Sequence, residues 1–154
     1  MPRSFRFHTS LLPLLIMAGT TCARAADCHL KIDANDQMQF SQHQLELPAA
    51  CAEIEVTLNH TGKLPAATMG HNWVLTRSKD ATAVATLGAG AGAQHNYLPV
   101  NDARIIAATR LIGGGESASV KFSTAGMKPG EDYTFFCSAP GHIAMMKGRF
   151  QFKP

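Results

Sequence analysis

Three kinds of side chain that can bind a metal or act as a nucleophile lie on one short segment near the C-terminus. Cys137 is separated by Ser138-Ala139-Pro140-Gly141 from His142, and two methionines, Met145 and Met146, follow shortly afterwards. The Pro-Gly pair predicts a turn, which lets the thiol and the imidazole face one point. The segment therefore gathers a thiol, an imidazole and a thioether on one connection between two expected strands, residues 133–136 and 147–153.

A second imidazole comes far upstream, in the run Met69-Gly70-His71-Asn72, directly before an expected strand at Trp73-Val74-Leu75. Two histidines, one cysteine thiolate and a weaker methionine sulfur form the donor set of a blue copper electron-transfer site. This mixture suits both oxidation states, because Cu(I) prefers soft sulfur whereas Cu(II) accepts imidazole nitrogen. The residues thus indicate a copper site, although spacing alone does not decide between Met145 and Met146.

Other chemistries are open to the same residues. Cys137 and His142 could act as a nucleophile and its base, but no orienting carboxylate or amide and no oxyanion motif accompanies them. A closed zinc site is a second alternative, in which the methionine would have no purpose. A copper-binding or copper-delivery protein is a third, although a thiolate and two imidazoles in a rigid loop favour retention of the metal over its release.

The stretches that must position these residues have the period of β-strands. Apolar and polar side chains alternate in residues 30–34, 54–58, 118–122 and 150–152, with turn signals between the stretches. This spacing predicts an all-β fold, a Greek-key sandwich or barrel. Residues 78–92 are Ala-rich and do not alternate. We expect them to form a short helical insertion that ends in a flexible stretch at residues 88–92.

The N-terminus has the pattern of a secretory signal peptide, residues 1–25. Two arginines precede an apolar stretch at residues 11–18, and Ala23-Arg24-Ala25 is a small-x-small cleavage site. We therefore expect one domain, residues 26–154, in the periplasm. No later stretch approaches the ~20 apolar residues that a membrane span needs.

Loss of this leader changes the charge and leaves an odd number of cysteines. The chain has 14 Lys+Arg against 11 Asp+Glu. The leader contains three of the arginines, so the numbers of basic and acidic side chains become equal once it is removed. A neutral domain argues against nucleic-acid binding, which needs clustered excess cations. Cleavage would discard Cys22, and the preceding Gly19-Thr20-Thr21 lacks the apolar residue typical of a lipidated cysteine.

Three cysteines remain after cleavage, namely Cys28, Cys51 and Cys137. In an oxidising compartment an odd number indicates an intermolecular bridge, a reactive thiol, or a thiol bound by something other than sulfur. Cys28 and Cys51 begin two strand-like stretches that a disulfide could join. Cys137 is then the odd cysteine, and its neighbours are the possible metal ligands described above.

The runs around these residues resemble the azurins, the bacterial blue copper proteins of the cupredoxin fold. The resemblance covers essentially the whole of residues 26–153. The matching runs are residues 35–40, 69–75, 104–107, 135–137 and 140–142.

This resemblance implies a cupredoxin-like fold with one type 1 copper ion. His71, Cys137 and His142 would bind the ion in a near-trigonal plane. Met146, rather than its neighbour, would be the long axial ligand, and the backbone carbonyl of Gly70 would be a weak contact on the opposite side.

The resemblance also implies a disulfide between Cys28 and Cys51, a partly buried His60 near the site, and an Asn72 that braces the ligand loops. It implies an electron carrier rather than an enzyme, a monomer whose partners are periplasmic redox proteins such as c-type cytochromes or reductases. Around His142 it places an uncharged apolar rim, made up of Met38, Leu64, Met69, Ala144 and Met145.

Two positions depart from the pattern of the azurins. Ala139 stands where a bulky aromatic residue is common, and Ala89 replaces a larger apolar residue on the expected docking face. The first change affects the shielding of the cysteine sulfur, which helps to set the reduction potential. Neither change removes an expected ligand.

Overall fold

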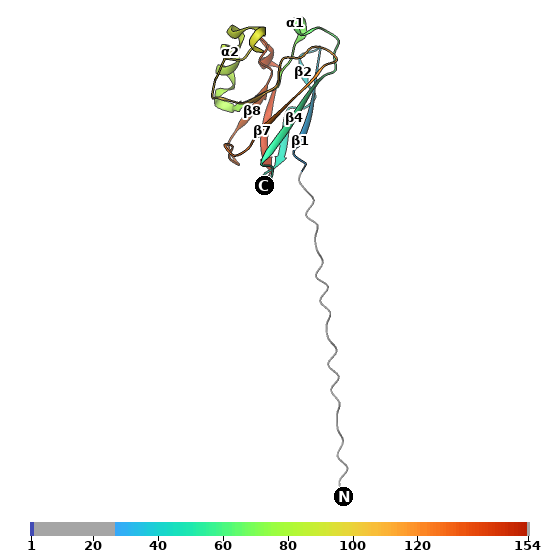
Figure 1. The fold of residues 1–154 in the computed structure, drawn as a ribbon, viewed down its shortest axis with the longest axis vertical. Coiled ribbons are helices and arrows are strands. Elements are labelled where there is room, and N and C mark those ends of the chain that lie inside the picture. Colours follow the sequence, from blue (N-terminus) through green and yellow to red (C-terminus); the bar gives the residue numbers. More distant parts are fainter. Residues whose placement is uncertain (2–26, 154) are drawn as a thin grey trace.

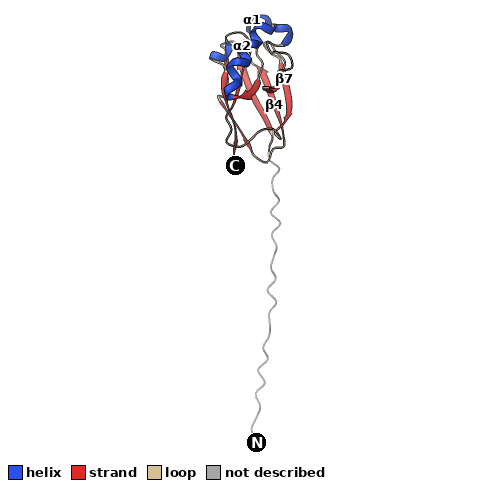
Figure 2. Ribbon diagram, turned by 90° about the vertical axis from the view of Figure 1, so that its left-hand side faces the viewer, coloured by secondary structure: helices blue, strands red, loops and turns tan. Residues whose placement is uncertain are grey.

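The computed structural model describes Met1 and residues 27–153, so the expected signal peptide lies outside the described residues apart from its first residue. Two β-sheets pack face to face, and helical segments cover one end and one side of them (Figures 1 and 2). The predicted sandwich is confirmed, and its two sheets do not close into a barrel. The elements in chain order are β1 (His29–Asn35), β2 (Gln39–Phe40), β3 (Gln44–Pro48), β4 (Glu53–His60), α1 (Ala66–Met69), β5 (Val74–Arg77), η1 (Ser78–Asp80), α2 (Ala81–Ala91), η2 (Ala93–His95), β6 (Ile105–Ala108), β7 (Ser117–Ser123), β8 (Tyr133–Phe136), η3 (His142–Ala144) and β9 (Lys147–Lys153).

The four-stranded sheet has the order β2-β1-β4-β7, and the five-stranded sheet has the order β3-β9-β8-β5-β6. The pairs β1–β4 and β3–β9 are parallel, and the other pairs are antiparallel. The sequence pattern predicted β1, β4, β5, β7, β8 and β9. It missed β2, which is too short for a periodic signal, and β6, whose Ile-Ile-Ala-Ala has no polar alternation. It also missed β3, although Leu45 and Leu47 alternate there.

The aromatic core lies against the chain that leads to the expected site. Trp73, fully buried directly before β5, has ring centroids 6.1 Å from Phe122, 6.1 Å from Phe135 and 6.4 Å from Phe150. Its indole N–H has no hydrogen-bond partner among the described residues, which shows how apolar these surroundings are. This packing fixes the start of β5, and with it the residues immediately before Trp73.

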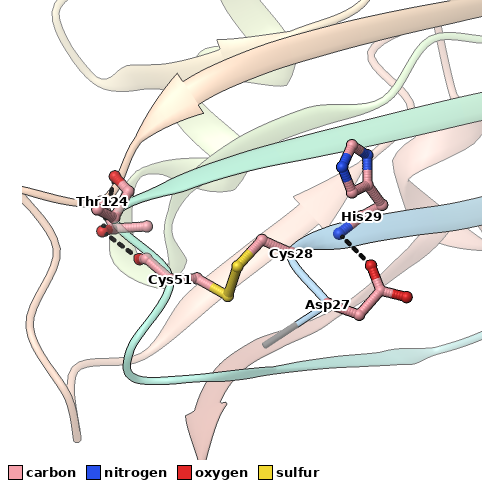
Figure 3. Close-up of a disulfide and its surroundings, with 6 residues drawn as sticks. Asp27, Cys28, His29, Cys51 and Thr124 are labelled. Carbon is pink, nitrogen blue, oxygen red and sulfur yellow. Dashed lines mark hydrogen bonds between the residues drawn. A yellow bond between two sulfur atoms is a disulfide. The ribbon is translucent and has the colours of Figure 1, made fainter. Parts of the chain in front are cut away.

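A disulfide joins the start of β1 to the residue preceding β4 by two positions. Cys28 and Cys51 are bonded with an S–S distance of 2.07 Å, as the resemblance implied (Figure 3). The Thr124 hydroxyl donates a hydrogen bond of 2.7 Å to the Cys51 carbonyl in the same region. Since β1 rises ~3.3 Å per residue, its far end at Asn35 lies roughly 20 Å from this bridge.

The Ala-rich insertion forms η1 and then α2, as expected, but residues 88–91 are helical rather than an irregular stretch. They complete the last turn of α2, and the helix ends at Gly92, whose φ of 79° is in the left-handed region. Gly88 is buried, and a Cβ there would overlap the carbonyl oxygen of Tyr97. The structure thus has a helical turn where a flexible stretch was expected, and Gly88 permits close packing of this turn on the following chain.

Two glycines of α2 should respond oppositely to replacement by alanine. Gly90→Ala meets no heavy atom within 4 Å and should raise the free energy of unfolding by about 0.5–1 kcal/mol, the usual gain in an exposed helix interior. Gly88→Ala should lower it by about 1–3 kcal/mol, because overlap with Tyr97 outweighs that gain. Chemical denaturation of both variants in the same metal state measures the difference. Equal effects of the two substitutions would contradict the packing described for Gly88.

Candidate metal centre

Antiparallel pairing of β5 with β8 brings together residues that are distant in the sequence. Val74 pairs with Phe136, so the residues just before β5 lie beside those just after β8. His71 precedes β5 and Cys137 follows β8, and their side chains meet although 66 positions separate them. This end of the sandwich also carries α1 (Figure 1).

The loop from Cys137 to Met146 is closed by its own backbone. The Cys137 N–H donates to the Met146 carbonyl at 3.0 Å, and the Met146 N–H donates to the His142 carbonyl at 2.7 Å. Gly141 makes the turn before η3 with a φ of 82°, a conformation that glycine adopts at little cost. The predicted turn is thus present, and it directs the His142 ring toward the cysteine sulfur.

Three donor atoms form a nearly regular triangle. The Cys137 Sγ lies 3.7 Å from His71 Nδ1 and 3.6 Å from His142 Nδ1, and the two nitrogens are 3.2 Å apart. The centre of this triangle is about 2 Å from each donor, close to the ~2.0–2.3 Å bonds that Zn²⁺ forms with imidazole nitrogen and thiolate sulfur. The spacing and the chemistry of these donors therefore fit a metal ion.

A backbone carbonyl selects the nitrogen that His71 presents. His71 Nε2 donates to the carbonyl of Asn35 at 2.8 Å, so Nδ1 of the neutral ring has a free lone pair for a metal. The Asn35 side-chain oxygen accepts the N–H groups of Gln37 at 3.0 Å and Gln39 at 3.2 Å, which holds this carbonyl in place. Sequence reasoning missed Asn35, and no side-chain pattern could reveal a role played by its backbone.

Burial sets the protonation of the donor group. It lowers the pKa of His71 to about 4 and also lowers the pKa of His142, so both imidazoles are neutral at pH 7. Burial raises the pKa of the Cys137 thiol to about 11, although the N–H groups of Asn72 and Ala139 oppose the shift. In the absence of metal the thiol keeps its proton, and a metal cation must displace it on binding.

Exposure distinguishes the two methionines and the two histidines. Met146 is fully buried in the same apolar cluster as Cys137, whereas Met145 is 60% exposed. His71 is fully buried and His142 is half-buried. Of the four side chains expected to bind copper, His142 alone is not fully buried.

The family model for "Copper binding proteins, plastocyanin/azurin family" matches residues 26–153. The chain belongs to this plastocyanin/azurin family. It is 48% identical over 134 residues to an azurin of Bordetella pertussis, covering 87% of this chain and 89% of the relative. It is 48% identical over 128 residues to an azurin of Pseudomonas denitrificans, covering 83% of this chain and all of the relative.

The solved structure of the azurin Az-iso2 from Methylomonas sp. strain J superposes with a TM-score of 0.81 and 44% identity. The match covers 84% of this chain and 100% of the Az-iso2 chain. The cofactor of this plastocyanin/azurin family member is copper, and its two imidazoles and one thiol are compatible with a type 1 site. In the described part of the chain, no helix has both the length and the apolar character that crossing a membrane requires.

His60 supports the His71 ring in this azurin-like protein. The two rings stack with centroids 4.7 Å apart, and His60 Nε2 donates to the Met69 carbonyl at 2.8 Å. With 2% of its surface exposed, His60 is fully buried rather than partly buried. The carboxylate of Asp36, which sequence reasoning missed, lies 3.9 Å from His60 Nε2 and accepts the backbone N–H of Lys63 at 2.8 Å.

The remaining positions singled out in the sequence lie around the same loops. Gly70 is buried between α1 and the following chain, where a Cβ would overlap the carbonyl oxygen of Ala66. Ala139 is buried, and its backbone carbonyl accepts the His142 N–H at 3.0 Å. This loop hydrogen bond does not depend on the size of the side chain at position 139. Ala89 is exposed on α2.

Proposed function

We propose that this protein is a periplasmic electron carrier that binds one type 1 copper ion and catalyses no reaction of its own. His71, Cys137 and His142 would hold the ion, with Met146 as the long axial ligand and the Gly70 carbonyl as a weak opposite contact. The triangle of donor atoms carries this proposal. When bound, copper supplies one-electron chemistry by alternating between Cu(II) and Cu(I).

The chain contributes a frame that changes little between oxidation states. Asn35 fixes the His71 ring through its carbonyl, and the bond between the Cys137 N–H and the Met146 carbonyl ties the two ends of the loop together. A donor group held by the backbone in this way has little freedom to rearrange. Such restriction favours rapid electron exchange, and it also favours retention of the metal over delivery to another protein.

Electrons would enter and leave through the exposed edge of His142. Pro140 has no N–H and Gly141 has no side chain, so a partner could approach this ring closely. The rim around it combines exposed Leu64, Ala144 and Met145 with half-buried Met38 and Met69. An uncharged rim suits brief contacts with redox partners such as c-type cytochromes or reductases, whose interfaces are small.

The remaining features of the proposal are a signal peptide at residues 1–25, a mature domain at residues 26–154, and a monomeric state. The leader directs export through its apolar stretch and cleavage site. Equal numbers of acidic and basic side chains in the mature domain give neither long-range attraction nor long-range repulsion between copies, so the monomeric state rests on the resemblance to azurins.

Addition of Cu(II) to the metal-free protein tests this function. One equivalent should produce an intense blue absorption from thiolate-to-copper charge transfer, an EPR spectrum with narrow copper hyperfine splitting, and reversible bleaching on reduction. Zn(II) serves as the control, because it binds the same donors and has no such absorption. Loss of copper on reduction would favour the delivery protein, and binding without blue colour would overturn thiolate ligation.

A further inference from the structure

A buried hydrogen-bond network connects the two segments that carry His71 and Cys137. The Asn72 amide accepts the Ser138 N–H at 2.8 Å and donates to the Ser138 hydroxyl at 2.8 Å. It also donates to the backbone carbonyl of Asn96 at 2.8 Å, and the Ser138 hydroxyl donates to the same carbonyl at 3.3 Å. Asn96 therefore receives hydrogen bonds from the residues that immediately follow both expected ligands.

The side chain of Asn96 reaches a third segment. Its Oδ1 accepts the N–H of Leu111 at 2.8 Å. The next residue, Ile112, forms a two-way backbone bridge with His71, with N···O distances of 2.9 Å and 2.8 Å. One residue thus contacts the chain after His71, the chain after Cys137, and the chain that pairs with His71.

Asn96 also has a backbone conformation that the surroundings must maintain. It follows η2 with φ 55° and ψ 28°, and Tyr97 has a φ of 54°. Two successive non-glycine residues in the left-handed region persist only where neighbouring contacts hold them. The Tyr97 carbonyl packs against Gly88 of α2, so the helix contributes to holding them.

We propose that Asn96 is a positioning residue of the copper centre, through which α2 and η2 support the chain segments carrying His71 and Cys137. The backbone carbonyl ties the Asn72 and Ser138 side chains together, and Oδ1 fixes the Leu111–Ile112 segment against His71. The role toward copper rests on the ligand assignment of the proposed function, whereas the effect on the backbone does not.

Asn96→Gly tests the side-chain part of this support. Glycine tolerates the left-handed conformation and keeps the carbonyl, so the variant removes chiefly the acceptor for Leu111. Asn96→Asp restores an oxygen at the same position and is the matched rescue variant. Amide hydrogen exchange of His71 and Ile112 in the metal-free protein reports on the backbone, and Val56 in the centre of β4 reports on global stability.

We expect the His71 and Ile112 amides of Asn96→Gly to exchange at least tenfold faster than in the parent, with Val56 unchanged. In the copper-loaded protein, transfer of copper to a chelator should accelerate about tenfold and the EPR hyperfine splitting should change. Asn96→Asp should reverse all three effects. Exchange and copper transfer within twofold of the parent would overturn the proposal, as would equal acceleration at Val56 or failure of the aspartate to rescue.

These outcomes remain distinct from failure of the proposed function. A parent protein that binds copper without blue colour would refute thiolate ligation, while the metal-free exchange measurements would still decide the role of Asn96 in the backbone. A blue parent with unaltered exchange in Asn96→Gly would refute the positioning role alone.

Discussion

Cys137→Ser is expected to abolish the blue absorption of the copper-loaded protein while leaving the fold intact. The colour requires charge transfer from a thiolate, and a serine hydroxyl keeps its proton and is a harder donor. Because Cys137 is fully buried and its backbone bond to Met146 needs no side chain, the smaller oxygen should be accommodated. Visible, EPR and circular dichroism spectra of the variant measure colour, copper environment and fold.

The other two cysteines of the described chain provide a matched control. The double variant Cys28→Ala/Cys51→Ala removes the disulfide at the opposite end of β1, roughly 20 Å from the donor group. It should stay blue and lose roughly 3 kcal/mol of unfolding free energy, the usual effect of opening a loop of this length. A blue Cys137→Ser variant would refute the thiolate assignment.

Met69→Lys should slow electron self-exchange by an order of magnitude or more without changing the copper spectrum. Met69 lies half-buried next to Gly70, on the rim from which a partner would approach His142. In self-exchange the same rim of both molecules meets, so the substitution sets two ammonium groups against each other and removes apolar contact. Added salt should restore part of the rate, because it screens the repulsion between the lysines.

Leu87→Lys is the control for the charge itself. Leu87 is 54% exposed on α2, outside the apolar rim, and the substitution adds the same ammonium group. Its self-exchange rate should match that of the parent within about twofold. If Met69→Lys and Leu87→Lys behave alike, or if Met69→Lys exchanges as fast as the parent, the electrons pass through another surface.

The two expected histidines illustrate what the sequence could predict. Cys137, His142 and Met146 lie within one loop, and a local turn is enough to bring the first two together, so their spacing was informative. His71 lies 66 positions before Cys137, and only the β5–β8 pairing brings its ring to the same point. Both strands were expected from the sequence, although neither belongs to the alternating stretches, and a strand pattern does not specify its partner or its register.

The helical insertion shows the opposite case. Its composition predicted a helix, but the glycines at its end were mistaken for a flexible stretch. Glycine permits flexibility and close packing equally well, and only the position of the Tyr97 carbonyl against Gly88 decides between them.

The sequence by itself determined the chemistry of this protein, because the types of donor atoms and the alternation of apolar side chains are properties of the residues. The tertiary structure decided which atoms act and what supports them. The Asn35 carbonyl selects Nδ1 of His71, and the Asn96 carbonyl and amide join three distant segments. Every residue has a backbone carbonyl, so the donor that a given carbonyl accepts from is decided by where the fold places it and not by the kind of side chain that the residue carries.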